Sequence, residues 1–107
     1  MVLTVLEATV APERVADLRA AFEAAGAGRR PPGLVRSELL CDANVPTRWR
    51  VQTHWESRAA LDAMRRQPGT PAGVLMFRAA GAEPALTVFE VTASLSGEAP
   101  ADGELRR

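Results

Sequence analysis

The chain contains no lysine, no isoleucine and no tyrosine, and all 13 of its basic residues are arginine. The 13 acidic residues balance them, so the formal net charge at pH 7 is zero. Proteins that bind nucleic acid or membrane surfaces through general electrostatics carry a basic excess. The charge balance therefore argues against both of these classes.

Cysteine and histidine each occur once, as Cys41 and His54. A single cysteine cannot form an intramolecular disulfide, and the two residues together fall short of the ligands of a zinc site. We interpret Cys41 as a small buried apolar residue and His54 as structural rather than catalytic. The glycine-rich segments precede turns and do not open helices after strands, so no nucleotide site is expected.

Long apolar runs are also absent. No stretch approaches the 18 residues that indicate a transmembrane helix. The first residues follow an apolar strand pattern and lack the basic region of a secretion signal, so we expect a cytoplasmic protein. A length of 107 residues suits one compact domain and is too short for two.

Apolar periodicity predicts four strands and three helical segments. Ser57 is placed to cap the second helix, while Pro12 and Pro71 suit the first turns of the other two. The predicted strands are residues 2–10, 34–41, 48–56 and 85–95.

The resulting order, βαββαβ with an extra helical turn before the last strand, predicts a ferredoxin-like α+β fold. Such a fold has an antiparallel four-stranded sheet with helices on one face. We assign residues 1–95 to this domain. Residues 96–107 are polar, charged and without apolar period, so we expect a loose C-terminal tail whose removal leaves the fold intact.

Alternation along the strands sorts the side chains onto two faces. The apolar face, which would include Phe89, should meet the helices, and the other mixes Arg48, Arg50 and Glu90 with leucine and valine. Such a mixed face would expose apolar surface unless a second copy covered it. We therefore predict a homodimer through this face. The alternative is an ordinary exposed face with scattered apolar residues.

Trp55 and Arg78 are the candidates for chemistry. Trp55 ends the third strand on the helix-facing side, and Arg78 follows Val74 by one helical turn. An indole and a guanidinium that share an apolar cavity would hold a flat, electron-rich, acidic molecule. Two plainer interpretations remain open, in which Trp55 is a core residue and Arg78 extends to the helix surface.

Four further motifs occur in the chain. They are Pro31-Pro32-Gly33-Leu34-Val35-Arg36, His54-Trp55-Glu56-Ser57 with Ala60-Leu61, Gln67-Pro68-Gly69, and Phe77-Arg78-Ala79-Ala80. Together they resemble the antibiotic biosynthesis monooxygenase family of dimeric α+β barrels, over residues 2 to about 95. The separation of Trp55 from Arg78 resembles that in the family's small anthrone monooxygenases, where a tryptophan and an arginine belong to the active site.

The resemblance implies that an anthrone-like aromatic polyketide intermediate is oxidised to a quinone, with O2 as co-substrate and no metal, flavin or haem cofactor. Arg78 would hold the enolate oxygen, and Trp55 would pack on the ring or donate its N–H. The family's first strand carries an asparagine where this chain has Leu6. A hydroxyl of Thr4, Ser37 or Thr53 would have to supply the polar contact instead.

The predicted cavity lies between the sheet and the helices, with Trp55 and Arg78 as catalytic residues and a small aromatic ligand. A non-oxidative binding, auxiliary or cyclase-like subunit of a polyketide pathway is the alternative function. Haem degradation has less support, because the positions matching its functional residues are about Leu6, Met64 and Val74. The predicted substrate-binding residues are Leu6, Thr4, Ser37, Trp49, Thr53, Met64, Val74, Phe77 and Phe89.

Overall fold

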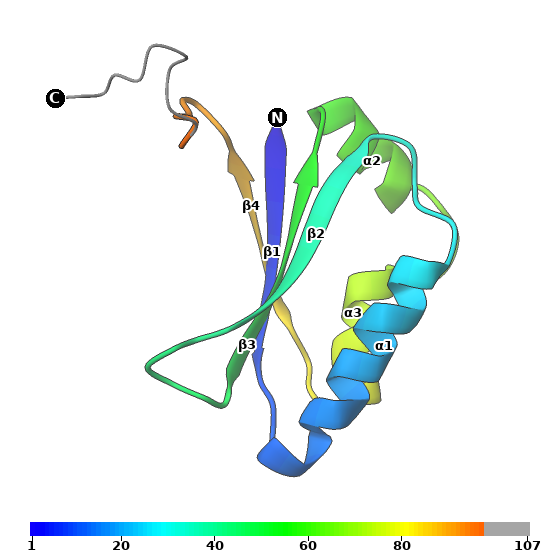
Figure 1. Cartoon of the computed structure of the whole chain (residues 1–107). Helices are drawn as coiled ribbons and strands as arrows, with labels where there is room; N and C mark the ends of the chain where they lie inside the picture. The colour runs from blue at the N-terminus through cyan, green and yellow to red at the C-terminus, as the bar shows by residue number, and fades with distance from the viewer. Residues whose placement is uncertain (98–107) are drawn as a thin grey trace, which may run out of the picture.

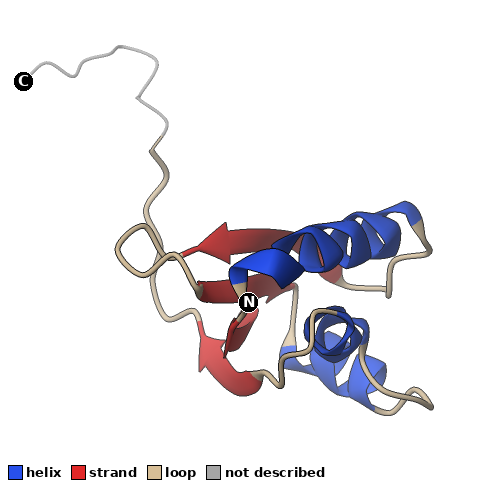
Figure 2. Cartoon of the chain, turned by 90° about the horizontal axis from the view of Figure 1, so that it is seen from below, coloured by secondary structure: helices blue, strands red, loops and turns tan. Residues whose placement is uncertain are grey.

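The computed structural model describes residues 1–97, in which four antiparallel strands form one sheet in the order β2-β3-β1-β4. The α-helices of this part of the chain lie on one side of the sheet (Figure 1; Figure 2). The predicted ferredoxin-like α+β arrangement is confirmed. The elements are β1 (Val2–Thr9), η1 (Pro12–Arg14), α1 (Val15–Ala27), β2 (Leu34–Cys41), β3 (Arg48–Trp55), α2 (Arg58–Arg65), α3 (Ala72–Ala79) and β4 (Ala85–Glu90).

Local sequence signals set the boundaries of these elements. The Ser57 hydroxyl oxygen accepts a hydrogen bond from the Ala60 backbone N–H at 3.1 Å and caps α2, as predicted. Pro12 opens a 3-10 turn, η1, before α1 begins. Gly33 has a φ of 84°, and a Cβ there would collide with the Ala60 side chain, so the turn into β2 requires glycine.

The end of the chain differs from the prediction. The last strand ends at Glu90, five residues before the predicted position 95, and residues 91–97 belong to no regular element. Most of the tail predicted at 96–107 lies outside the described residues. Within residues 1–97, no helix is long and apolar enough to cross a membrane.

The apolar core has two parts, each centred on one tryptophan of β3. The Trp55 cluster, near α2, has Val2, Trp55 and Leu61 as its buried members. The Trp49 cluster, under α1 and α3, is larger. Its buried members are Ala8, Val10, Leu18, Trp49, Val51, Met76, Phe77 and Ala80.

Strand β4 presents the opposite face from the one predicted. Its register pairs Val88 with Thr4 and Phe89 with Leu3. Thr4 contacts Trp55 on the helix-facing side, so Val88 faces the helices and Phe89 lies on the other side of the sheet, called here the open face. Both sides of β4 carry bulky apolar residues, and for this reason alternation alone did not distinguish them.

Two further residues lie on the other side of the sheet from the one predicted. Leu34, predicted on the side away from the helices, packs against the Trp55 cluster, because an irregularity between Leu34 and Arg36 shifts the register of β2. Glu90 pairs with Val2 and therefore does not lie on the open face. Arg48 and Arg50 are on the open face as predicted, and both form ion pairs with Glu7.

Candidate functional site

A cavity of about 700 Å³ lies between the sheet and the helices at the Trp55 end of the molecule. Its size lies within the range of pockets for small organic ligands. The end of α1, the last turns of α2 and the start of α3 form its walls. Its floor is the helix-facing side of the sheet, with Thr4, Leu6, Ser37, Val51, Thr53 and Trp55.

Small residues on the helices leave this space open. Ala25 and Gly26 of α1 face the cavity where larger side chains would fill it. Gly73, in the first turn of α3, allows the helix to approach the sheet: a Cβ there would lie 2.5 Å from Cδ1 of Leu6. The cavity therefore exists because the side chains at these positions are small.

Three hydroxyl groups cross the floor side by side. Strand register places Thr4 opposite Thr53 and Thr53 opposite Ser37, and we call these three residues the hydroxyl row. The Ser37 and Thr53 oxygens are 2.8 Å apart, and the Trp55 indole N–H donates to the Thr4 oxygen at 3.1 Å. Because a hydroxyl has one proton, these contacts leave the Thr4 proton and one proton of the Ser37–Thr53 pair for a ligand acceptor.

The charged residues of the lining are all arginines. Among the described residues that form the cavity there is no aspartate, glutamate, histidine or cysteine, so the lining offers no ordinary general base. Arg36 contributes to the lining, but its guanidinium pairs with Glu38, 3.3 Å away. Arg29, Arg30 and Arg65, all exposed, surround the mouth. The site is thus apolar inside and positive at its entrance.

The structure brings together most of the predicted site residues. Trp55, only 3% exposed, lies on the floor beside the hydroxyl row. Leu6 closes the floor beneath α3. The predicted residues found in the cavity lining are Thr4, Leu6, Ser37, Thr53, Trp55, Met64 and Val74.

The predicted position of Arg78 in this cavity is wrong. Arg78 lies on the outer side of α3, where its guanidinium donates two hydrogen bonds of 2.9 Å to the Glu83 carboxylate. Gly81, with a φ of 73°, turns the chain back so that Glu83 reaches the helix. The hydrogen bonds from Arg78 hold the pKa of the Glu83 carboxyl below its usual value, and those same bonds raise the pKa of Arg78. The arginine therefore already has an anionic partner.

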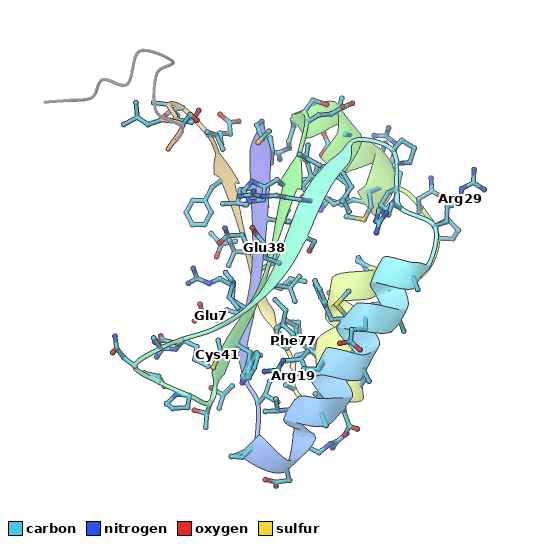
Figure 3. The ribbon with its side chains drawn as sticks, in the orientation of Figure 1. Glu7, Arg19, Arg29, Glu38, Cys41 and Phe77 are labelled. Atoms are coloured by element: carbon cyan, nitrogen blue, oxygen red, sulfur yellow. The ribbon has the colours of Figure 1, made fainter. Side chains whose placement is uncertain are left out.

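Three other predicted residues also lie away from the cavity. Phe77 is fully buried between the sheet and α1 (Figure 3), where it fills the Trp49 cluster. Trp49 is buried in the same cluster, and the Arg19 guanidinium lies 5.5 Å from the centre of its ring. Phe89 is 50% exposed on the open face. Periodicity predicted burial correctly for the first two but not which part of the core they join.

Sequence reasoning missed Arg29, Arg30 and Arg65 at the mouth and the small residues that open the cavity. Both signals are visible in the chain, as the run Ala24-Ala25-Gly26-Ala27-Gly28 and the pair Arg29-Arg30 directly after it. The run was interpreted only as a helix end. Gly73 was also missed, because the reason for a glycine inside α3 is the approach of Leu6 from another element.

No cluster of His, Cys, Asp and Glu suited to a metal ion occurs in residues 1–97. His54 lies on the open face, and its Nε2 is 3.4 Å from a Glu38 oxygen. Cys41 is exposed, contrary to the prediction of burial, since the end of β2 runs past the core. Neither side chain reaches the cavity.

The family model described as antibiotic biosynthesis monooxygenase matches residues 1–73. A Deinococcus radiodurans structure assigned to such monooxygenases has a TM-score of 0.71 at 19% identity, covering 90% of this chain and 97% of that one. SnoaB, a cofactor-independent oxygenase from Streptomyces nogalater, gives 0.67 at 23% identity, with 88% and 95% covered. The haem degrader MhuD from Mycobacterium tuberculosis gives 0.65 at 23%, with 90% and 100% covered. No curated protein sequence matches the chain.

Proposed function

The chain belongs to the antibiotic biosynthesis monooxygenase family, and from this premise we propose that it is a cofactor-independent monooxygenase. Its substrate would be an anthrone-like aromatic polyketide intermediate, which O2 oxidises to a quinone. The observation that carries the proposal is the hydroxyl row beside Trp55 on the floor of an apolar cavity. The similarity in fold to SnoaB agrees with it.

The proposed reaction requires little from the protein. The anthrone CH2 loses a proton to water, and the resulting electron-rich anion transfers an electron to O2. The two radicals combine into a peroxide anion at this carbon, which takes a proton back from the water that accepted it. The hydroperoxide so formed then loses water to leave the carbonyl of the quinone. One O2 is consumed, one of its oxygens enters the product and the other leaves as water. The protein needs to stabilise the anion and to exclude bulk water.

The hydroxyl row supplies that stabilisation in the proposed complex. The Trp55 N–H occupies an acceptor site on the Thr4 oxygen, which leaves the Thr4 proton available for the enolate oxygen of the substrate. A second proton comes from the Ser37–Thr53 pair. Two hydroxyl donors in an apolar, partly enclosed site stabilise a developing negative charge more strongly than water would. This assigns to hydroxyls the role that the family resemblance implied for Arg78.

Haem suits the cavity poorly. Haem iron in oxygen-using proteins is usually held by histidine, cysteine or tyrosine. None of these lines the described cavity. The positions that match the functional residues of haem degraders hold Leu6, Met64 and Val74. We therefore derive no step through haem, although MhuD shares the fold.

Turnover by the purified full chain tests the proposal. An anthrone in aerated buffer should give quinone absorbance with one O2 consumed for each quinone formed, at an unchanged rate after treatment with a chelator. Thr4→Val should slow the reaction by about 100-fold, the usual effect of losing one donor to a transition-state anion. Thr9→Val, an exposed position on the same strand, is the matched control and should have no effect.

A non-oxidative ligand-binding or auxiliary subunit is the second candidate. It is favoured by Leu6, which stands where the family's asparagine is expected, and by the lack of a base in the described lining. In that case the protein would bind the anthrone, but quinone formation would match the rate in buffer alone. That result would reject the oxygenase and retain the binding site.

We also propose that the protein forms a homodimer through the open face. Phe89 and Leu40 are 50% and 37% exposed there, next to the ion pairs of Glu7 with Arg48 and Arg50. Burial of this apolar surface against a second copy is the simplest explanation for its exposure. Sedimentation equilibrium should give the mass of two chains, and Phe89→Arg should give one. Leu75→Arg, an exposed residue of α3, is the control, and a single-chain mass for the wild type would rule out the dimer.

A further inference from the structure

Two of the three methionines in the chain line the cavity. Met64 belongs to the last turn of α2 and packs against the Trp55 cluster, and Met76 of α3 is a buried member of the Trp49 cluster. The third, Met1, is 54% exposed and does not line the cavity. Thioether sulfurs are therefore present on two walls of the site, above the floor that carries the hydroxyl row.

These two thioethers are the most easily oxidised groups of the described lining. A thioether sulfur is a soft nucleophile that peroxides convert to a sulfoxide, and peroxides oxidise an indole such as that of Trp55 far more slowly. The single thiol of the chain, Cys41, is exposed at the end of β2 and does not line the cavity. A peroxide held inside the cavity would therefore react first with sulfur of Met64 or Met76.

We propose that Met64 and Met76 are oxidation sites, whose thioethers take an oxygen atom from an organic hydroperoxide held over the hydroxyl row. The sulfur attacks the outer peroxide oxygen, so that an S–O bond forms and the O–O bond breaks. The proton of the outer oxygen moves to the oxygen that stays on carbon. The products are a methionine sulfoxide and an alcohol, and the two electrons lost by sulfur reduce the peroxide. This inference rests on the proposed function for the source of the hydroperoxide.

Oxidation of these residues would make the site self-limiting. A sulfoxide is polar where the thioether was apolar, and burial of a polar group without a hydrogen bond is costly. Met76 is 8% exposed within a packed cluster, so its sulfoxide would disturb the wall formed by α3. The sulfoxide of Met64 would place a polar oxygen beside the Trp55 cluster. Because reductases return methionine sulfoxide to methionine, the resulting loss of activity should be reversible.

Two peroxides of different size and polarity test the inference without turnover. The protein is the full chain with Leu75→Met, which adds an exposed methionine next to Met76 as the matched control. Tandem mass spectrometry of tryptic peptides measures the sulfoxide at each position. Hydrogen peroxide should oxidise position 75 first, because that side chain is exposed. Cumene hydroperoxide is apolar and aromatic, and it should oxidise Met64 and Met76 about tenfold faster than position 75, because binding holds it beside the sulfur. In urea this preference should vanish.

Turnover separates this inference from the proposed function. With an anthrone, O2 and catalase, sulfoxide should accumulate at Met64 and Met76 as the rate declines, and methionine sulfoxide reductases should restore the rate. Quinone formation without sulfoxide at these positions would overturn the inference and retain the oxygenase. Faster reaction of position 75 than of Met64 and Met76 with cumene hydroperoxide would also overturn it. Selective oxidation of Met64 and Met76 by cumene hydroperoxide, without quinone formation from the anthrone, would retain the oxidation sites and reject the oxygenase.

Discussion

Trp49 and Trp55 share one face of β3, yet their surroundings differ. Both rings are buried, with 6% and 3% exposure. Trp49 is surrounded by packed side chains, and its indole N–H has no hydrogen-bond partner among the described residues. Trp55 borders a cavity, and its N–H is held by Thr4. The Trp49 end of β3 belongs to the packed core, and the Trp55 end borders the candidate site.

The helices opposite the two tryptophans cause this difference. Leu18 of α1 and Phe77 of α3 fill the space over the Trp49 end, and both are fully buried. Over the Trp55 end the same helices present Ala25, Gly26 and Gly73. A uniform strand pattern can thus support close packing or a binding cavity, depending on the bulk that faces it.

Loss of packing at the Trp49 end should have the largest effect on the free energy of unfolding. Phe77→Ala would leave a cavity in a filled cluster and should lower the free energy of unfolding by about 3–5 kcal/mol. Urea denaturation followed by circular dichroism measures this change. Leu75→Ala, on the exposed side of the same helix, should change it little. Equal losses for the two variants would mean that the Trp49 cluster is not the main core.

A larger side chain in the cavity at the Trp55 end should reduce ligand affinity more than it reduces the stability of the fold. In Gly73→Ala the new methyl group meets the flexible end of Leu6 and should push it into the cavity. Stability should hold, since alanine favours a helix over glycine by about 1 kcal/mol. Affinity for anthraquinone-2-carboxylate, a stable analogue of the proposed quinone product, should fall about tenfold in titration calorimetry, equivalent to about 1.4 kcal/mol.

The double variant Leu6→Ala, Gly73→Ala is the control for that experiment, because the shortened side chain removes the clash. It should regain most of the lost affinity. Failure of the double variant to recover, with a folded protein, would show that Gly73 acts through something other than Leu6.

Fluorescence can separate the two tryptophans directly. Trp49→Phe retains Trp55 as the sole indole, and its emission should be quenched when the quinone ligand binds. Trp55→Phe retains Trp49, whose emission should change little because that ring lies outside the cavity. Quenching of the same size in both variants would place the ligand elsewhere.

The smallest effect should come from Arg78→Gln. Because the Arg78 guanidinium lowers the Glu83 pKa, their pair stabilises the fold above the ordinary carboxyl pKa, and this contribution is lost as pH falls through the lowered value. The melting temperature should drop slightly at neutral pH and match the wild type in acid, since both side chains are exposed. Arg66→Gln should show no such pH dependence. Loss of turnover in Arg78→Gln would instead support the original catalytic prediction.

The first three strands, the start of α2 and the fold class followed from the sequence, because they depend mainly on interactions between near neighbours. Ser57 caps its own helix, and the alternation of Trp49, Val51, Thr53 and Trp55 places all four on one sheet face. The hydroxyls of Thr4, Ser37 and Thr53 were predicted as cavity residues for the same reason. Their alignment into a row follows from strand register, which no single segment contains.

Tertiary structure alone decided which buried residues border empty space and which arginines are neutralised. Phe77 and Met64 both have inward helical positions, but only Met64 faces the cavity. Arg78 has the sequence context of a ligand-binding cation, but a turn at Gly81 brings Glu83 to it. Cavity shape and charge pairing depend on contacts between distant segments, so the sequence determined the scaffold of this protein and the packing of that scaffold determined its site.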